Sequence, residues 1–298
     1  MHLALLADFH NGDPQPILSS LNRHRPDLIA IAGDLIYGSQ PRSLDPNSEP
    51  ELVIKSQVNV LPLLTGCASI APTFISLGNH EWMLNSEDLQ LIKSTGAVVL
   101  DNRWEHPHVH QTNRGYYQNN RENLNNLENL NNLENKIWLD ISIGGLSSGY
   151  VEDYRRFLSS IPTSVKQKHR YITDAVIRGC GMKIDDEVED KNTHTPDTSW
   201  LGKLPRGYKI LLCHHPEYIN KIPESIQLVL SGHAHGGQWR FYDPIHRTWR
   251  GVFAPGQGLF PKLTEGVHGR HVISRGLNNT TWIPRFFNEP EIVYIRGG

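Results

Sequence analysis

Five short apolar runs in the sequence are each followed by side chains that can bind a metal ion. These side chains are Asp8 and His10, Asp34, Asn79 and His80, His214, and His233 and His235. Imidazole and carboxylate groups are common ligands of divalent transition metals, and imidazole is also the usual acid or base near neutral pH. The sequence therefore predicts a metal site with acid–base chemistry beside it.

The number and spacing of these residues favour two ions over one. Two pairs, at positions 8 and 10 and at positions 233 and 235, are spaced two residues apart. On an extended chain such residues point to the same side. Seven candidate ligands (four His, two Asp and one Asn) exceed what one ion with an open position uses, but they suit two ions that share a carboxylate. Gly33, Gly78 and Gly232 adjoin three of the sites, where we expect them to let the backbone turn sharply.

The elements that must position these residues alternate between strands and helices over the first hundred positions. We expect strands at 2–7, 27–32, 73–77 and 97–100, and helices at 16–24, 51–65 and 86–95. Later we expect strands at 137–143, 208–213 and 226–231, a helix at 151–159, and short β-like pieces at 238–242, 249–253, 270–274 and 291–295. Strands that share a core sheet would bring their carboxyl ends, and hence the candidate ligands, to one edge. This pattern predicts an α/β architecture.

Composition narrows the class of protein. The 298 residues include 16 histidines and carry a net charge of −2, which does not indicate a protein that binds nucleic acid or anionic membranes through its overall charge. The three cysteines (Cys67, Cys180 and Cys213) are far apart and form no zinc knuckle or disulfide framework, which favours a reduced compartment. Neither a membrane span nor a signal peptide is evident. We expect a cytoplasmic protein, with peripheral attachment at the inner membrane as an alternative.

A repeated hexapeptide stands out in the middle of the chain. Residues 122–136 read ENLNNL twice before the pattern breaks off, with a leucine at every third position. A period of three drifts around an α-helix, and two copies are too few for a solenoid. We interpret this segment as an exposed insertion, and a protein-binding segment is the alternative.

The five motifs, taken together, resemble those of the calcineurin-like metallophosphoesterase superfamily. They are D-x-H at 8–10, GD at 33–34, GNHE at 78–81, the histidine at 214 and GHxH at 232–235, in the order of that family. The continuation GHAHGGQWR is similar to a bacterial GHxHGGQ-type branch of predicted phosphohydrolases. The resemblance implies two mixed β-sheets flanked by helices, an α/β/β/α sandwich. It also implies a single domain over 1–298, in which 101–136 and 160–205 are enlarged.

The resemblance also implies a role for each candidate residue. Asp34 would bridge two divalent ions, and His80 would be the catalytic histidine that binds neither ion. The first ion would be held by Asp8, His10 and His235, and the second by Asn79, His214 and His233. A hydroxide between the ions would attack a phosphate ester, and His80 would protonate the leaving oxygen. The mixed imidazole and carboxylate ligands favour Mn, with Fe or Zn as alternatives.

The substrate expected from this resemblance is a small phosphoester: a phosphodiester, a pyrophosphate or a monoester, nucleotide-linked or lipid-linked. Tyr37 stands where many relatives have an acidic residue, and the two enlarged segments would shape the substrate pocket. Cys213 precedes His214 and should therefore point into the core.

Three alternatives compete with this interpretation. One is a catalytically weak scaffold of the same fold, with 122–136 as its binding segment. A nuclease is disfavoured because no basic or aromatic stripe is evident. The sequence GLSSG at 145–149 matches the nucleophile elbow GxSxG, which would make Ser147 the nucleophile of a serine hydrolase, but it leaves the five motifs unexplained.

The alternating histidines at 106, 108 and 110 are interpreted as a surface loop.

Overall fold

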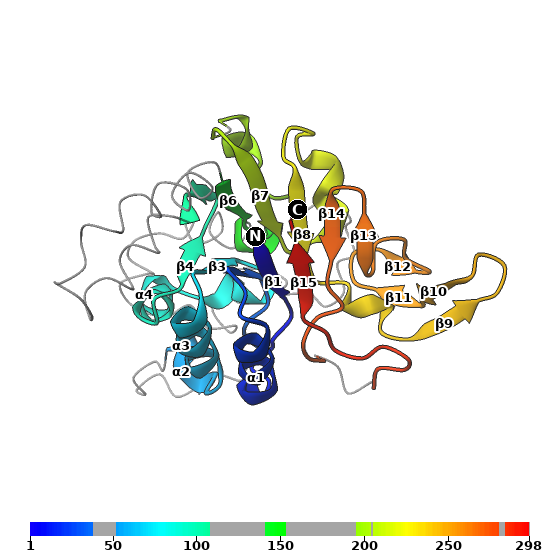
Figure 1. Cartoon of the computed structure of the whole chain (residues 1–298), viewed down its shortest axis with the longest axis horizontal. Coiled ribbons are helices and arrows are strands. Elements are labelled where there is room, and N and C mark those ends of the chain that lie inside the picture. The colour runs from blue at the N-terminus through cyan, green and yellow to red at the C-terminus, as the bar shows by residue number, and fades with distance from the viewer. Residues whose placement is uncertain (38–51, 108–140, 153–194, 204, 280–283, 298) are drawn as a thin grey trace, which may run out of the picture.

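In the computed structural model of the chain, two β-sheets lie face to face (Figure 1). The structure describes residues 1–37, 52–107, 141–152, 195–203, 205–279 and 284–297. The first sheet has the order β15-β1-β2-β3-β4, in which β1 to β4 are parallel and β15 is antiparallel to β1. Its strands are β1 (His2–Leu6), β2 (Leu28–Ala32), β3 (Thr73–Ser76), β4 (Val98–Leu100) and β15 (Val293–Arg296).

The second sheet has six strands in the order β13-β14-β8-β7-β6-β5. The central four are parallel, and the two edge strands are antiparallel to their neighbours. They are β5 (Arg103–Glu105), β6 (Ile141–Leu146), β7 (Tyr208–Cys213), β8 (Leu228–Ser231), β13 (Gly266–His268) and β14 (His271–Ile273). Each sheet is therefore mixed, as expected from the sequence.

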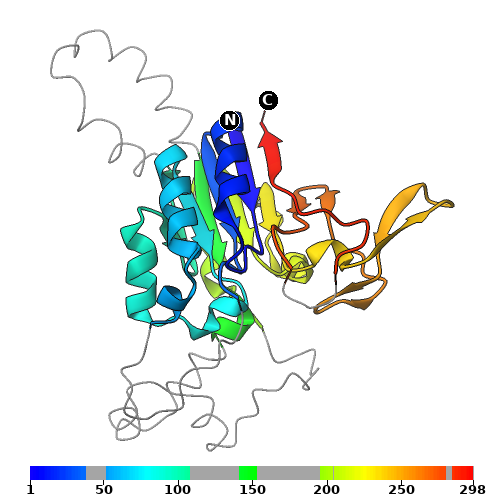
Figure 2. The ribbon, with the colours of Figure 1, turned by 90° about the horizontal axis from the view of Figure 1, so that it is seen from below.

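Alternation along the first strand explains how the layers are built. Leu3 and Leu5 pack into the core between the two sheets, whereas Ala4 and Leu6 pack into the core under the helices. Because successive side chains of a strand point to opposite faces, a strand that is apolar throughout can be buried on both sides. The helices that cover the first sheet are α1 (Pro14–His24), α2 (Val53–Ser56), α3 (Val60–Ile70) and α4 (Ser86–Ser94). Figure 2 shows α1 and α3 on the outer face of that sheet.

Short helical turns cover the second sheet on its outer face. Leu201 of η2 (Ser199–Gly202) and Tyr218 of η3 (Pro216–Lys221) pack with Leu211 and Val229 of the sheet. The remaining turns are η1 (His80–Met83) and η4 (His235–Gly237). The layer order helix, sheet, sheet, helical turn confirms the expected sandwich of two mixed sheets.

Local sequence signals set where the helices begin and end. Asp13 caps α1 by accepting a hydrogen bond from the backbone N–H of Gln15, and Pro14 occupies the first turn, where its missing N–H costs nothing. Helix α4 begins with a capping box between Asn85 and Asp88. Such a cap contributes about 1 kcal/mol to stability.

The helix expected at 51–65 is wrong in its extent. The structure has two helices there, α2 and α3, separated at Gln57–Asn59, and the second continues to Ile70. Asn59 donates from its backbone N–H to Oδ1 of Asn11 at 2.8 Å, and the Oε1 atom of Gln57 accepts a hydrogen bond from the backbone N–H of Tyr37. These contacts with the loops after β1 and β2 break the helix.

The strand expected at 137–143 ends later than predicted, and residues 137–140 lie outside the described part of the chain. The observed β6 pairs with β7 over its whole length, from Ile141 opposite Tyr208 to Leu146 opposite Cys213. Pairing with a neighbour therefore extends the strand three residues beyond the predicted end.

The C-terminal pieces do not continue one sheet. Strand β14 joins the second sheet, β15 returns to the first, and two hairpins stand apart from both. The hairpin strands are β9 (Arg240–Asp243) with β10 (Thr248–Gly251), and β11 (Phe253–Ala254) with β12 (Gly258–Leu259).

Several sequence predictions concern residues that the structure does not describe. The repeat at 122–136 lies outside the described residues, as do most of the segments 101–136 and 160–205, so their roles stay predictions. Residues 149–152 are helical, and most of the helix expected at 151–159 lies outside the described residues as well. Within the described part of the chain, no helix combines the length and the apolar character needed to span a bilayer.

Candidate metal centre

The candidate ligands lie where strands of both sheets end. Asp8, Asp34 and Asn79 come two or three residues after β1, β2 and β3 of the first sheet. His214 follows β7 directly, and His233 comes two residues after β8 of the second sheet. The two sheets therefore bring residues that are more than 200 positions apart in the sequence to one place.

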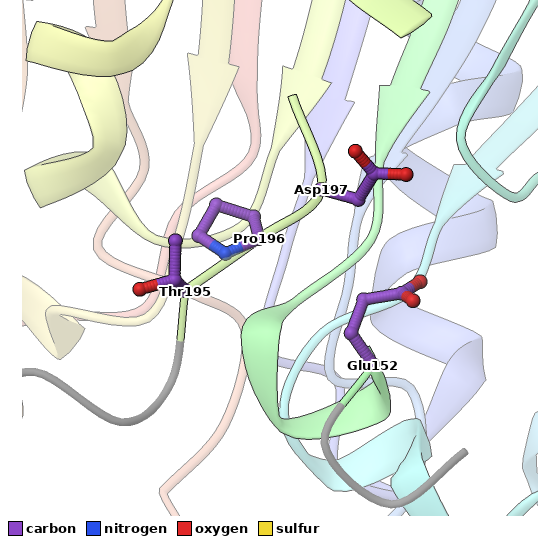
Figure 3. A pocket seen from close by; sticks show the side chains of 4 residues that line it. All are labelled: Glu152, Thr195, Pro196 and Asp197. Atoms are coloured by element: carbon purple, nitrogen blue, oxygen red, sulfur yellow. The ribbon is translucent and has the colours of Figure 1, made fainter. Parts of the chain in front are cut away.

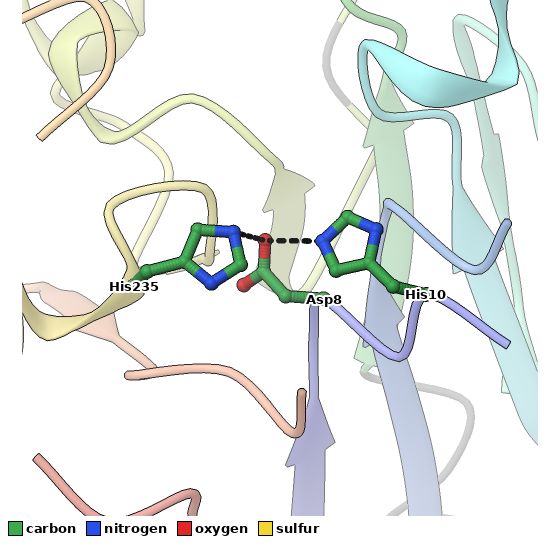
Figure 4. Close-up of side chains that lie close together, drawn as sticks. All are labelled: Asp8, His10 and His235. Atoms are coloured by element: carbon green, nitrogen blue, oxygen red, sulfur yellow. Dashed lines mark ion pairs between the residues drawn. The ribbon is translucent and has the colours of Figure 1, made fainter. Parts of the chain in front are cut away.

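Asp8, His10 and His235 form one group of possible metal ligands (Figure 4). Oδ1 of Asp8 is 3.8 Å from Nε2 of His10 and 3.5 Å from Nε2 of His235. The two imidazole rings stack with their centroids 5.3 Å apart. All three side chains are buried, so an ion placed among them would be largely shielded from water.

Asp34 is the centre of a second group, which includes His214 and His233. Its Oδ2 atom is 3.1 Å from Nε2 of His214, 3.6 Å from that of His80 and 3.9 Å from that of His10. One carboxylate therefore contacts histidines of both groups, which is the arrangement expected of a bridging ligand.

Backbone carbonyls fix which nitrogen of two histidines is available. Nδ1 of His10 donates to the carbonyl of Ile36 at 3.1 Å, and Nδ1 of His214 donates to that of Ala32 at 2.6 Å. In the neutral form that binds a metal, an imidazole has one proton, so Nε2 of each ring then keeps its lone pair. Both Nε2 atoms are buried without a hydrogen-bond partner, as is Oδ1 of Asn79. Unpaired buried acceptors are costly, and a divalent cation would satisfy all three, so the residues fit a metal site.

His235 is held differently. Nη2 of Arg285 lies 2.9 Å from its Nδ1 atom, and Asn288 donates to its backbone carbonyl. Because a guanidinium only donates, Nδ1 is the acceptor here and Nε2 carries the proton directed at Asp8. Coordination through Nε2 would require Arg285 to give up this contact.

The backbone geometry of the ligand loops was not predicted correctly. The expectation that positions 8 and 10, and 233 and 235, lie on extended chain is wrong. Asp8 (φ 54°), His10 (43°), Asp34 (53°), His233 (66°) and His235 (46°) all adopt left-handed backbone conformations. Such conformations cost energy for non-glycine residues and cluster at functional sites. The tight turns, not strand alternation, aim these side chains at one point.

Two of the adjoining glycines serve close approach rather than turning. A side chain on Gly78 would collide with the Asp34 carboxylate, and a Cβ on Gly232 would lie 2.6 Å from Oδ2 of Asp8. Neither has a left-handed φ, whereas Gly33, at φ 79°, does turn as expected. The carboxylates therefore pack directly on the backbone.

The histidines stabilise the charged form of the two buried aspartates. Burial alone would raise the pKa of Asp8, but His235, His10 and His214 hold it below its usual range. The same holds for Asp34. Burial opposes ionisation of its carboxyl group, but His214 and His80 lower its pKa well below the usual value. In return, Asp34 raises the pKa of His214 to about 10 against the effect of burial. Without a cation, a proton on His214 balances the carboxylate charge, and a divalent ion would compete with that proton.

His80 is the most exposed of these histidines, with 22% of its side chain accessible. Its backbone N–H donates to Oδ1 of Asp34 at 3.0 Å. Burial lowers its pKa, although Asp34 acts in the opposite direction. The ring therefore stands at the opening of the site, where it could meet a leaving group.

Glu81 is the last residue of the GNHE motif, and the sequence alone did not predict a role for it. The buried carboxylate accepts hydrogen bonds from the backbone N–H groups of Asp34, Leu35 and Gly78 at 2.7–2.8 Å. Burial raises its pKa to about 7, and these N–H donors act in the opposite direction. Glu81 thus ties the two ligand loops together. Its place two residues after the candidate ligand Asn79 in the motif was the available signal.

The serine-hydrolase alternative does not fit the geometry. Ser147 is fully buried, and its hydroxyl donates to Oδ1 of Asp101 rather than to a histidine. The neighbouring Ser148 does lie 2.8 Å from Nε2 of His215, whose Nδ1 is 3.1 Å from Glu217. However, Ser148 is itself 1% exposed and accepts from the backbone N–H of Tyr150, so it caps a helix and offers no open nucleophile.

Other predictions from the sequence can be placed as well. Cys213 is buried in the core beneath the second sheet, as predicted, and burial raises the pKa of its thiol. His106 approaches the carbonyl of Ile141 through Nδ1, while positions 108 and 110 lie outside the described residues. Tyr37 is 40% exposed.

A pocket of about 380 Å³ lies away from these ligands (Figure 3). It is lined by Glu152, Thr195, Pro196 and Asp197. Two carboxylates would repel a phosphate group, and none of the candidate ligands contributes to it. We therefore do not assign this pocket to the phosphoester.

Comparison with known proteins agrees with the geometry. The chain is 28% identical over 113 residues to a Bacillus subtilis (strain 168) protein named uncharacterized metallophosphoesterase YkoQ. That match covers 36% of this chain and 40% of the relative, so it spans less than half of either protein. The model of the calcineurin-like phosphoesterase family matches residues 1–237, a range that contains all five ligand motifs. The chain therefore belongs to the calcineurin-like phosphoesterase family.

Proposed function

We propose that this protein hydrolyses a phosphoric ester with two divalent metal ions held side by side. The observation that carries the proposal is the position of the Asp34 carboxylate, within 4 Å of histidines from both ligand groups. Asp8, His10 and His235 would hold the first ion. Asn79, His214 and His233 would hold the second, and Asp34 would contact both.

When bound, the two ions would lower the pKa of a water molecule and neutralise charge on the phosphate oxygens. The residues of the chain supply the rest of the chemistry. The backbone carbonyls of Ala32 and Ile36 orient two imidazoles, and Glu81 holds the loops that carry Asp34 and Asn79. His80, at the exposed edge of the site, donates a proton to the leaving oxygen.

The ligand set supports a choice of metal. A ligand set of imidazole and carboxylate groups without thiolate suits Mn, and Fe or Zn are the alternatives. Among the described residues, the thiol of Cys213 lies in the core and approaches the carbonyl of His215, so it is not available as a ligand.

The substrate is a small phosphoester: a phosphodiester, a pyrophosphate or a monoester. The GHAHGGQ sequence at 232–238 supports membership of the GHxHGGQ-type branch. Nucleotide-linked and lipid-linked esters are the two candidate classes of substrate. The competing function is that of a scaffold without catalytic activity. The presence of every proposed ligand and of His80 in the sequence argues against it.

A substrate panel tests the proposal. Protein loaded with Mn would be assayed on p-nitrophenyl phosphate, bis-p-nitrophenyl phosphate, cyclic nucleotides and a UDP-sugar pyrophosphate, with and without EDTA. We expect turnover on at least one substrate that EDTA abolishes and Mn restores. Full metal occupancy without turnover on any substrate would favour the scaffold. Turnover that resists EDTA would contradict the metal mechanism.

A further inference from the structure

An unusually apolar surface lies beside the metal centre. In the described part of the chain, fifteen large apolar side chains are exposed, and ten of them fall within 239–260 and 286–287. We call these two segments the aromatic surface. Exposed apolar groups scattered singly need no explanation, but a concentration of this kind marks an interaction site.

The β9–β10 hairpin forms the projecting part of the aromatic surface and extends away from both sheets (Figures 1 and 2). Its register places Trp249 opposite Tyr242, and the two rings contact with centroids 5.8 Å apart. Phe241 lies on the opposite face and contacts Phe260. At the tip, Ile245 is 85% exposed. Aromatic side chains are therefore exposed on both faces of a two-stranded hairpin, behind a tip that exposes Ile245.

The second segment of the aromatic surface lies against the base of the hairpin. Phe286 contacts Trp239 at 6.0 Å between ring centroids, and its backbone carbonyl accepts a hydrogen bond from Arg240. Phe287 contacts Trp249 at 5.6 Å. The two segments thus form one continuous surface.

Positive charge accompanies these aromatic residues. The aromatic surface, residues 239–260 and 286–287, contains three Arg residues and one acidic residue, a local net charge of +2, whereas the whole chain carries −2. Arg240 pairs with Glu265 and Arg250 pairs with Asp243. Arg247, near the tip, and Lys262 form no ion pair with the other described residues. The surface is therefore complementary to an anionic partner.

The aromatic surface is tied to the ligand loop. Gly237, which ends η4, packs so closely on Gly251 of β10 that neither position has room for a side chain. On the other side, Asn288 follows Phe287 directly and donates to the carbonyl of His235. Both segments are thus fixed to the turn that carries a candidate metal ligand.

We propose that the aromatic surface docks the protein on an anionic lipid bilayer. Trp and Tyr prefer the interfacial region of a membrane, and Arg and Lys bind lipid phosphates. A protein partner would cover one face of the hairpin, whereas a bilayer can surround a hairpin that exposes aromatic side chains on both faces. In this arrangement Ile245 enters the acyl boundary, with Trp249 and Arg247 at the headgroups.

Docking would bring the phosphate groups of lipids to the side of the metal centre. This last step rests on the proposed hydrolysis, but the docking itself does not. If both hold, the substrate is a phosphoester or pyrophosphate linked to a lipid.

Vesicle co-sedimentation of the full chain tests the docking. We expect the protein to sediment with phosphatidylglycerol/phosphatidylethanolamine vesicles, to bind phosphatidylcholine vesicles at least tenfold more weakly, and to lose affinity as salt is added. Ile245→Glu should weaken binding at least tenfold. Val58→Glu, at a position that is 68% exposed between α2 and α3, is the matched control and should bind like the wild type. Thermal unfolding would confirm that both variants fold.

Three outcomes would overturn the docking. These are no sedimentation of the wild type, equal binding to neutral vesicles, and equal binding by Ile245→Glu. Sedimentation velocity would also show whether the surface instead joins two copies of this chain: a wild-type dimer that Ile245→Glu converts to monomer, without vesicle binding, contradicts the proposal. If vesicles bind but neither the soluble-substrate panel nor a lipid-linked phosphoester or pyrophosphate is hydrolysed, the proposed function fails and the docking stands.

Discussion

The carboxylate of Glu81 lies against the backbone of Asp34 and holds the loop that carries this candidate bridging ligand. Its Oε2 atom accepts from the N–H groups of Asp34 and Gly78, and its Oε1 atom from that of Leu35. One buried side chain therefore fixes the ends of β2 and β3 relative to each other. This relationship makes Glu81 a positioning residue, because it acts on the ligand loops without contacting substrate.

Glu81→Gln should therefore destabilise the fold. The amide keeps one acceptor oxygen and turns its NH₂ group toward backbone donors, which leaves N–H groups buried and unpaired. Each costs about 1–3 kcal/mol, so we expect the free energy of unfolding to fall by roughly 2–5 kcal/mol. Urea denaturation would measure the change, with Glu87→Gln at an exposed position of α4 as control. A loss below about 1 kcal/mol would contradict this role.

Asp34→Asn and Asp8→Asn should differ in metal content. Asp34 contacts histidines of both ligand groups, so its neutralisation should remove both ions, whereas Asp8→Asn should chiefly weaken the first. Elemental analysis after loading with Mn would give the stoichiometry. Asp197→Asn, a carboxylate of the separate pocket, should keep the full metal content. Full occupancy in Asp34→Asn would rule out the bridging role.

His80→Asn separates catalysis from metal binding. The side chain stands at the exposed edge of the site, and His80 is not among the seven proposed ligands. We expect near-normal metal content with kcat reduced about 10²–10⁴-fold, the typical contribution of a general acid. His246→Asn, on the exposed hairpin, is the control. Normal turnover in His80→Asn would remove this residue from the mechanism.

Neither serine of the GLSSG sequence should act as a nucleophile. Ser147 donates to Asp101 and Ser148 caps a helix, and both are buried. A fluorophosphonate probe should therefore label neither residue, and Ser147→Ala should keep its hydrolytic activity. Stoichiometric labelling at either position, detected by mass spectrometry, would revive the serine-hydrolase interpretation.

The sequence was most informative where a local pattern decides the structure. Apolar runs such as 28–32 can be buried on both faces only in a covered parallel sheet, and their ends locate the candidate ligands. The residue types and their order along the chain therefore predicted that Asp8, Asp34 and His214 would be neighbours, given strands that share one core. The helix caps at Asp13 and Asn85 are equally local.

Prediction was wrong or silent where contacts are distant in sequence. The break between α2 and α3 depends on Asn11, 48 residues before Asn59. The left-handed backbone at His10 and His235 reflects packing from both sheets, which no local propensity encodes. Likewise, the hydrogen bonds of Glu81 link positions 46 and 47 residues away. Each of these features depends on contacts that form only in the folded chain.

His271 provides a pH-dependent contribution to stability outside the metal centre. Its Nε2 atom lies 2.8 Å from the hydroxyl of Ser231, and the residue is 1% exposed within the second sheet. Burial, together with the charges of His268 and Arg270, lowers the pKa of His271 from 6.5 to about 4. In the unfolded chain the ring regains its ordinary pKa, so the unfolded state binds the proton more readily.

The stabilising effect of neutral His271 is thus complete above pH 6.5 and is lost as the pH falls toward 4, by about 3 kcal/mol at most. His271→Gln can retain a hydrogen bond to Ser231 but cannot titrate. We therefore expect its free energy of unfolding to fall less steeply than that of the wild type between pH 6.5 and 4, measured by urea denaturation at fixed ionic strength. His24→Gln, on the exposed face of α1, should follow the wild-type slope. Parallel curves for the wild type and His271→Gln would show that this histidine does not set the acid sensitivity.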